Sequence, residues 1–474
     1  MKRLSGWDAV LLYSETPNVH MHTLKVAVID VSEISDRFDV KVFRRTLRRR
    51  LHKLEPFRYQ LVEIPGKFHH PMFREHVDVD LDYHVRPWKL PAPGGRRELD
   101  EAIGEIASTP LDRSKPLWEM YLIEGLADGK IAVVGKVHHA LADGVASGNL
   151  MARGMDIDTG LQDERDIYVT DPVPRSTQLV NEAFRDHMRG IGRLPGLFKY
   201  TYDGVRRVRQ SGRKMGLELS RPVEPPPTFM NHMLRPERTF ATATLPLADV
   251  KQTSKHLGVT INDLVLSISA GALRQLLLRY DGVADDPLVA SVPVAFDTSD
   301  RISGNKFTGM LVALPTHLTD PLERVRYAHD AATAAKESNY LLGPELVSRW
   351  TNYLPPSAAE AMFGWLATRD GQNKLQNLTI SNVPGPRSYG KVGGALVTEL
   401  YSVGPLTAAA GLNITVWSYV DQLSISVLSE PATLEDPHEL TEAMIAEFVE
   451  LRRAAGLSTE LTPLDVQPQV SVSA

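Results

Sequence analysis

The chain of 474 residues is 43% hydrophobic and 23% charged, a composition typical of a globular protein with room for two or more domains. Its formal net charge of −5 gives no basic signal, so a nucleic-acid partner is not expected. It has no cysteine, which excludes disulfides, thiolate metal sites and cysteine nucleophiles and favours a reducing compartment. The first residues lack the apolar segment of a secretory signal, and no apolar run is long enough to span a bilayer. We therefore expect a cytoplasmic protein whose contact with membranes is at most peripheral.

The first 160 residues alternate predicted strands and helices. Apolar residues at every second position predict strands, and apolar residues at every third or fourth position predict helices. We expect strands at 21–29, 118–123 and 131–137, shorter strand-like pieces near Val62, Phe73 and Val79, and helices at 40–54, 98–108 and 148–155. This alternation predicts an α/β domain over residues 1–160.

Residues 161–237 differ in character from the residues on either side. Proline-rich stretches flank a basic, helical middle over 184–214, which also carries apolar residues such as Phe184, Met188 and Ile191. We expect a linker helix that lies on the two domains. Contact of this segment with anionic lipid is the alternative, because a helix with basic and apolar faces suits a membrane surface.

Residues 238–460 return to alternating elements and predict a second domain, followed by a flexible tail over 461–474. We expect strands at 239–245, 288–294, 307–314, 377–381, 396–403, 412–418 and 423–428, and helices at 248–257, 260–280, 320–338, 436–453 and twice within 344–368. The helix at 260–280 is nearly all apolar and is expected to be buried, with Thr260 as its N-cap.

One short motif concentrates the titratable residues. The predicted strand 131–137 leads directly into His138 and His139, which are followed by Asp143 and Gly144. Histidine is the usual general base near neutral pH, because its ordinary pKa is about 6.5. Adjacent side chains on a strand point to opposite sides, so only one of the two histidines is expected to face a shared cavity.

Other chemistries find less support in the sequence. The two histidines and Asp143 could ligate a metal, but adjacent side chains diverge and His69 and His70 are too isolated to complete a site, so no metal is expected. The chain has no Gly-x-Ser-x-Gly, Gly-x-Gly-x-x-Gly, Walker A or His-Glu-x-x-His motif. A histidine base without a nucleophile of its own suggests direct attack by a substrate group that the base activates.

The run from His138 to Gly144, His-His-x-x-x-Asp-Gly, resembles the active-site signature of the superfamily that includes chloramphenicol acetyltransferase, carnitine acyltransferases and peptide-synthetase condensation domains. Further segments resemble the bacterial wax ester synthase/diacylglycerol acyltransferase family in particular. These segments lie in order at 8–16, 20–22, 116–118, 261–263, 292–294, 304–305, 314–315, 382–386 and 404–405. One departure is 295–297, Ala-Phe-Asp, where many members carry a Ser and an Arg soon after the Val-Pro-Val run, and no role is assigned there.

The resemblance implies two chloramphenicol-acetyltransferase-like α/β domains, each a mixed sheet packed by helices, with the active-site channel between them. It implies an O-acyltransferase that moves a long acyl chain from acyl-CoA to diacylglycerol, to a fatty alcohol, or to both. Two alternatives stay open. One is a condensation-type acyltransferase with an acyl donor bound to a carrier protein, and the other is a non-catalytic protein that binds lipid bodies.

The resemblance also implies roles for the motif. His139 would act as the general base, and Asp143 would pair with an arginine and hold the loop. Gly144 would allow a tight turn or a close backbone approach. The role of His138 stays open.

Three residues outside the motif are candidates for support. Asn262, at the start of the buried helix, is either the hydrogen-bond donor to the developing oxyanion or an N-terminal capping residue. Asp263 is expected to support that turn. Glu15 either lines the same cavity or lies on the surface.

The implied partners follow from the reaction. We expect acyl-CoA as substrate, no further cofactor, and lipid alcohols as acceptors. Peripheral association with the inner membrane or with lipid droplets stays open, as do the oligomeric state, the acyl chain length and the preference between triacylglycerol and wax ester.

Overall fold

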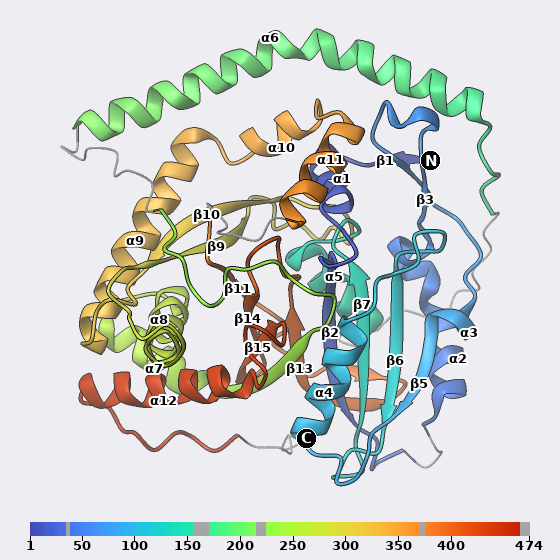
Figure 1. Ribbon diagram of the computed structural model, residues 1–474. Coiled ribbons are helices and arrows are strands. Elements are labelled where there is room, and N and C mark those ends of the chain that lie inside the picture. The colour runs from blue at the N-terminus through green and yellow to red at the C-terminus, as the bar shows by residue number, and fades with distance from the viewer. Residues whose placement is uncertain (35–37, 156–169, 215–223, 369–374, 465–474) are drawn as a thin grey trace, which may run out of the picture.

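A computed structural model describes residues 1–34, 38–155, 170–214, 224–368 and 375–464. The predicted flexible tail falls mostly on 465–474, outside the described residues, as do the first residues of the predicted linker. Within the described residues the chain forms two six-stranded mixed sheets, one small three-stranded sheet, and helices that pack on them (Figure 1). This arrangement confirms the predicted two-domain α/β fold with mixed sheets.

The first sheet holds the His-His motif. Its strand order is β12-β13-β2-β7-β6-β5. The strands are β2 His22–Asp30, β5 Val85–Lys89, β6 Trp118–Glu124, β7 Ile131–His138, β12 Lys391–Val392 and β13 Ala395–Val403. Strand β7 is central and pairs with β2 and β6 on its two sides, so the motif stands at the end of a strand held from both edges.

The second sheet has the order β10-β9-β11-β14-β15-β8. Its strands are β8 Thr239–Pro246, β9 Leu288–Ala295, β10 Phe307–Leu314, β11 Leu378–Val383, β14 Leu412–Tyr419 and β15 Gln422–Ser429. The small sheet joins β1 Lys2–Arg3, β3 Gln60–Val62 and β4 Met72–Arg74. Most inner strand residues are apolar and fully buried, which gives each large sheet its own hydrophobic core.

The helices cover the sheets and connect them. They are α1 Gly6–Tyr13, α2 Val40–Arg50, α3 Leu81–His84, α4 Arg96–Ala107, α5 Gly144–Gly154, α6 Ser176–Lys214, α7 Leu247–Leu257, α8 Ile261–Tyr280, α9 Pro321–Leu342, α10 Leu346–Thr351, α11 Pro356–Ala367 and α12 His438–Ala454. Helices α8, α9 and α12 pack together beside the second sheet, while α4 of the first half packs on β8 of the second sheet. The long helix α6 runs across the top of the molecule above both halves (Figure 1).

The second half of the chain supplies two strands, β12 and β13, to the first sheet. After β11 in the second sheet, the chain passes to β12 and β13, and β13 pairs with β2 in the first sheet. It then returns to β14 in the second sheet. Residues 238–460 therefore supply strands to both sheets, which ties the two halves together through the backbone.

Three local expectations were wrong. The helix predicted to reach residue 54 ends at Arg50 and continues as the 3-10 turns Leu51–Lys53 and Glu55–Arg58. Residues near Val79 form no strand, and the strand β5 was not anticipated. Strand β5 contains Pro87, which lowers its strand signal, but it lies at the edge of the sheet, where proline is tolerated.

By length and composition alone, helix α8 is long and apolar enough to cross a membrane, which differs from the expectation that no apolar run has that length. Most of it is buried inside the protein, and the core helix of a soluble protein passes the same test. Its burial agrees with the prediction made for residues 260–280.

Candidate active site

Strand β7 places the two histidines firmly. The backbone N–H of His138 donates to the carbonyl of Leu117 over 3.0 Å, and the N–H of His139 donates to the carbonyl of Met21 over 2.8 Å. The backbone is thus held from both neighbouring strands at the point where the side chains leave it. The two rings have different partners, as expected for adjacent residues on a strand.

The ring of His139 is half-buried and contacts residues from the second half of the chain. Its Nδ1 lies 3.0 Å from Oδ1 of Asn305, and its ring centroid lies 5.6 Å from that of Phe307. Asn305 is buried, and its Nδ2 donates to Oδ1 of Asp8 and to the carbonyl of His139, each over 2.8 Å. Residues from α1, from the end of β7 and from the segment before β10 therefore meet at this histidine.

These contacts select one tautomer of His139. The amide protons of Asn305 are used by Asp8 and by the carbonyl of His139, so Oδ1 is left to accept a proton from the ring. Nδ1 of His139 then carries the proton and Nε2 keeps its lone pair. A neutral imidazole with a free Nε2 is the form that a general base requires.

The surroundings favour that neutral form. Burial lowers the pKa of His139 and outweighs the nearby carboxylate of Asp143, which raises it. The charge of Lys25 lowers the pKa of His139 further. Lys25 is itself buried, with its ammonium hydrogen-bonded to Ser402 and 4.6 Å from the ring of Trp417, and burial lowers its pKa to about 7.

Asp143 joins the motif to the second half of the chain. Its Oδ1 accepts from the N–H of Ala146 over 2.9 Å and caps the N-terminus of α5. Its Oδ2 accepts from the guanidinium of Arg301 over 2.5 Å and from the backbone N–H of Lys306 over 2.8 Å. The carboxylate is 3% exposed, so it acts as a buried clasp on the loop that follows His139.

Gly144 is the first residue of α5 and lies against the second sheet. A Cβ added there would stand 3.1 Å from a methyl group of Val383 on β11, a tight contact. Its backbone has an ordinary negative φ, so close packing explains this glycine. Gly304 lies opposite the same loop, where its N–H donates to the carbonyl of Leu141 over 2.7 Å.

His138 faces the other side of the strand and is fully buried. Its Nδ1 accepts from the N–H of Ala140 over 3.1 Å, and its Nε2 lies 3.6 Å from a carboxylate oxygen of Glu15. Glu15 also accepts from the guanidinium of Arg113 over 2.7 Å. Burial raises the pKa of Glu15, but His138 and Arg113 together hold it well below its ordinary value, so Glu15 is a buried anion.

Asn262 lies at the second position of α8 and is half-buried. The N-cap is Thr260, as predicted, and it forms a capping box with Asp263. The carboxylate of Asp263 also lies 2.8 Å from Nδ1 of His329. The side chain of Asn262 makes no hydrogen bond with His139, or with any other residue in the described part of the chain. Asn262 therefore does not cap the helix.

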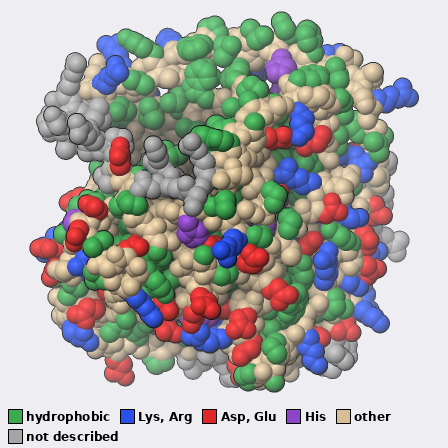
Figure 2. Space-filling model, viewed as in Figure 1, with side chains coloured by type: hydrophobic (Ala, Val, Ile, Leu, Met, Phe, Trp, Pro, Cys, Tyr) green, Lys and Arg blue, Asp and Glu red, His purple; other side chains and the backbone are tan. Residues whose placement is uncertain are grey.

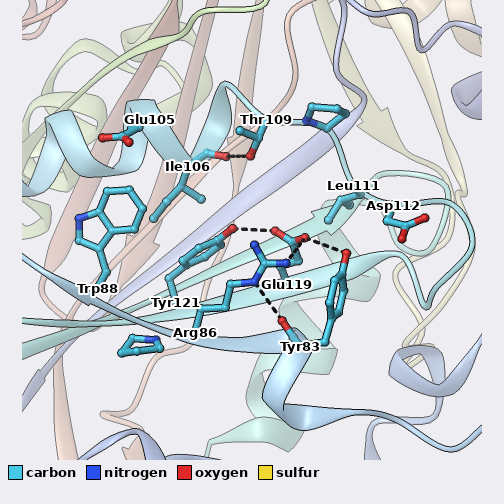
Figure 3. A pocket seen from close by; sticks show the side chains of 12 residues that line it. Tyr83, Arg86, Trp88, Glu105, Ile106, Thr109, Leu111, Asp112, Glu119 and Tyr121 are labelled. Carbon is cyan, nitrogen blue, oxygen red and sulfur yellow. Dashed lines mark hydrogen bonds and ion pairs between the residues drawn. The ribbon is translucent and has the colours of Figure 1, made fainter.

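Among the cavities that the described residues form, one lies against the first sheet, and a second lies between α11 and the end of α1 with the residues that follow it. The larger, about 640 Å³, lies between α4 and strands β5 and β6, where Arg86 contacts Glu119 and the backbone of Tyr83 (Figure 3). The smaller, about 510 Å³, includes Glu15 and Arg113 together with residues of α11. The ring of His139 lines neither of them, and the smaller cavity is the one that approaches the motif, through the contact of Glu15 with His138. Among the described residues no group of three or more histidine or acidic side chains is arranged to hold a metal ion.

Four residues of this site had no role assigned from the sequence: Asp8, Lys25, Arg301 and Asn305. Gly304-Asn305 and Asp8 belong to segments that resemble the acyltransferase family, so those segments were the available signal. The arginine partner implied for Asp143 had no assigned position, and the structure places Arg301 there.

Two domain models of one protein family match most of the chain. The wax ester synthase/diacylglycerol acyltransferase catalytic domain matches residues 4–265, and the C-terminal domain of the same proteins matches residues 303–452. The chain belongs to the wax ester synthase/diacylglycerol acyltransferase family. The predicted family and the predicted class of enzyme, an O-acyltransferase of the acyl-CoA type, are thereby confirmed.

Relatives with full-length matches support the same family. A Mycobacterium tuberculosis protein named as a diacylglycerol O-acyltransferase is 67% identical over 466 residues, which cover 98% of this chain and 99% of that protein. A second M. tuberculosis protein with the same name is 34% identical over 470 residues, which cover 96% of this chain and 98% of that protein.

Solved structures agree with the fold. The wax ester synthase/diacylglycerol acyltransferase from Marinobacter aquaeolei is 25% identical and aligns with a TM-score of 0.68 over 96% of this chain and all of that one. The first condensation domain of the CDA synthetase is 16% identical and aligns with a TM-score of 0.58 over 97% of this chain and 98% of that one. This second likeness shows that the chain has the fold of a condensation domain.

Proposed function

We propose that this member of the family transfers a long-chain acyl group from acyl-CoA to diacylglycerol, to a fatty alcohol, or to both. The names of its relatives support these substrates. The observation that carries the mechanism is the hydrogen bond from Nδ1 of His139 to Asn305, which leaves Nε2 of a neutral ring as a base. In this proposal no cofactor is needed besides acyl-CoA, which is a substrate.

In the proposed reaction Nε2 of His139 removes the proton of the acceptor hydroxyl. The hydroxyl oxygen attacks the thioester carbonyl carbon, and the carbonyl electrons move to oxygen. When the intermediate collapses, the C–S bond breaks and His139 returns the proton to the CoA thiolate. General base catalysis of this kind contributes about 10²–10⁴-fold.

The negative charge on the intermediate needs a donor, and we assign that role to Asn262. Its amide has no other partner among the described residues, and it lies at a helix N-terminus, where the backbone dipoles favour negative charge. Asp143 and Gly144 hold the loop after His139, while His138 and Glu15 form a buried pair behind it.

The acceptor lipids imply where the enzyme works. Diacylglycerol and fatty alcohols partition into membranes and lipid droplets, so we propose that the protein reaches them as a peripheral protein on the cytoplasmic side of such a surface.

A substrate panel tests the proposed function. Purified protein is given palmitoyl-CoA with diacylglycerol, hexadecanol or monoacylglycerol, and released CoA and the lipid product are both measured. We expect CoA release with formation of triacylglycerol or wax ester. Release only with an acyl group bound to a carrier protein would instead support the condensation-type alternative, and no release with any donor would support the lipid-binding one.

A further inference from the structure

More than half of the exposed large apolar side chains that the structure describes belong to neighbouring elements on one side of the molecule. These elements are α6, the turn after Pro65–Lys67, the end of α9, α10 and α11 (Figure 1). We call the following set the apolar roof: Phe68, Phe184, Met188, Ile191, Phe198, Tyr202, Tyr340, Val347, Met362, Trp365 and Leu366. Hydrophobic side chains gather along the upper edge of the space-filling view, over α6 (Figure 2).

Helix α6 supplies a continuous part of the roof. Phe184, Met188, Ile191, Phe198 and Tyr202 are spaced by three, four or seven residues, so they share one side of the helix. Each of them is 54–67% exposed. Single exposed apolar residues are ordinary on a protein surface, but a continuous patch marks a site of interaction with a protein or a membrane.

The exposure of this stripe is fixed by the contacts on the other side of α6. Leu179, Ala183 and Leu197 are buried against the protein. The hydroxyl of Tyr353 on the segment after α10 donates to the carbonyl of Gly190 over 2.9 Å. A Cβ on Gly204 would lie 2.3 Å from the carbonyl oxygen of Leu342, so only glycine lets the helix approach α9 this closely. Helix α6 is therefore seated on the protein with its apolar stripe turned away from the core.

The charge of α6 indicates what covers the stripe. Residues 176–214 contain nine Lys or Arg against three Asp or Glu, although the whole chain has a net charge of −5. Arg185, Lys199 and Arg206 are exposed, and at about 3.6 residues per turn they lie on or beside the apolar stripe. Basic side chains next to inserted apolar ones match a lipid surface that carries anionic headgroups.

Helix α11 links the roof to the smaller cavity. Met362 and Trp365 are exposed on this helix, while Gly364 and Ala367 line the cavity that also contains Glu15. The roof therefore borders the cavity that approaches the His-His motif. A lipid alcohol dissolved in a membrane that the roof contacts would lie next to this cavity.

We propose that the apolar roof seats the protein on an anionic lipid surface, with the apolar stripe of α6 inserted and the basic side chains beside it among the headgroups. This inference rests on the proposed function for one part only, namely that the surface also holds the acceptor lipid. The docking itself follows from the exposed stripe and its charge.

Vesicle flotation tests the docking. The full-length protein is mixed with vesicles of phosphatidylcholine alone, or of phosphatidylcholine with about one third phosphatidylglycerol. We expect the wild-type protein to float with the anionic vesicles and to be released by high salt. The double variant Phe184→Ser/Ile191→Ser should bind at least about tenfold more weakly, and Arg185→Gln/Lys199→Gln should bind weakly and lose most of the salt dependence.

A matched control separates the roof from general surface apolarity. Leu278 and Val283 are also exposed, at 48% and 58%, but lie at the end of α8 and in the loop after it, outside the roof. Leu278→Ser/Val283→Ser should float like the wild type, and all variants should melt at the wild-type temperature. Equal flotation of the roof variants and the wild type would overturn the proposal, as would roof variants that change only the oligomeric state.

A second readout distinguishes this proposal from the proposed function. The roof variants should release CoA at the wild-type rate with a short, water-soluble alcohol, and at least about tenfold more slowly with diacylglycerol in anionic vesicles. Equal loss with both acceptors would contradict a docking role. A wild-type protein that floats but releases no CoA with any acceptor would refute the proposed function and leave the docking standing.

Discussion

At the scale of single residues, the site depends on how His139 is held. Its Nδ1 is fixed by Asn305, and Asn305 is fixed in turn by the buried carboxylate of Asp8. Burial lowers the pKa of the ring, so the neutral base dominates near neutral pH. Orientation and protonation state are thus both set before any substrate binds, which is the condition for an efficient general base.

Removing the amide of Asn305 tests the orienting role. In Asn305→Ala the ring of His139 loses its Nδ1 partner and samples other orientations, so we expect kcat to fall about 10–100-fold, part of the roughly 10²–10⁴-fold from base catalysis. CoA release at saturating substrates measures this. Lys306→Gln, an exposed neighbour, is the control and should keep the wild-type rate. An Asn305→Ala enzyme with wild-type kcat would contradict the orienting role.

The charge of Lys25 leads to a prediction about the pH dependence of kcat/KM. Its positive charge lowers the pKa of His139, so Lys25→Met should raise that pKa. Because the proposed reaction needs neutral His139, the acid limb of the kcat/KM profile should move to higher pH. At pH values above that limb, kcat/KM should change little. The measurement is kcat/KM from about pH 5 to 9. A limb that stays in place, or moves to lower pH, would count against this coupling.

One variant tests both possible roles of Asn262, as oxyanion donor and as part of the helix cap. Since Thr260 and Asp263 form the capping box, Asn262→Ala should leave the free energy of unfolding unchanged. If Asn262 donates to the oxyanion, kcat should fall roughly 10²–10³-fold. Denaturant unfolding and CoA release measure the two quantities. A loss of stability at unchanged kcat would return Asn262 to a structural role.

The sequence identified some of these residues and missed others for a physical reason. The His-His motif is contiguous, so its residue types and the strand before it are visible together. Asn305 and Arg301 meet the motif from about 160 residues further along the chain, and spacing carries no information about such a contact. The resemblance pointed to the Gly304-Asn305 segment without giving its partner.

At the scale of elements, the loop between β7 and α5 is held by one carboxylate. Asp143 caps α5 and pairs with Arg301, whose side chain is 14% exposed. The loop also forms backbone hydrogen bonds with Gly304, so the end of β7 is joined to the segment before β10. The position of His139 relative to Asn305 depends on this clasp.

Removal of the clasp should cost stability as well as activity. Asp143→Ala leaves Arg301 unpaired and α5 without its cap, so we expect a loss of about 3–5 kcal/mol in the free energy of unfolding. Asp143→Asn keeps the acceptor for Ala146 and should lose less. Denaturant unfolding measures both, and Glu101→Ala on the exposed side of α4 is the control. If Asp143→Ala lowered the free energy of unfolding no more than Glu101→Ala does, Asp143 would not stabilise this loop.

Element prediction followed the strength of the local pattern. Strands β2, β6 and β7 alternate or are fully apolar and were found within one or two residues of their bounds. The edge strand β5 contains proline and alternates with polar residues, so its pairing with β6 decides its structure more than its own sequence does. Helix α6 was expected as a helix, but its contacts with α9 and α10 come only from tertiary structure.

At the scale of the whole molecule, the site exists only where the two halves of the chain meet. His139 and Asp143 come from the first half, whereas Asn305 and Arg301 come from the second. Strands β12 and β13 cross into the first sheet, and the buried carboxylate of Asp100 on α4 accepts from Thr242 on β8 and lies 3.1 Å from Nε2 of His438. These contacts keep the two halves in register around His139.

This arrangement could be expected only from the resemblance. Two α/β halves follow from the alternation of elements, but the order of strands in a sheet has no local signal in the sequence. The return of the chain through β12 and β13 is therefore visible only in the structure. The same holds for the apolar roof, since the sequence shows apolar residues in α6 without showing which of them stay exposed.

The most direct test is the release of CoA by the wild-type protein and by His139→Ala, with palmitoyl-CoA and diacylglycerol. The variant should keep the wild-type melting temperature and lose CoA release by at least about 10²-fold, because in the proposed reaction Nε2 of His139 accepts the hydroxyl proton. His76→Ala, which removes a half-exposed histidine outside the site, should keep the wild-type rate. A folded His139→Ala protein that releases CoA as fast as the wild type would show that His139 is not the base.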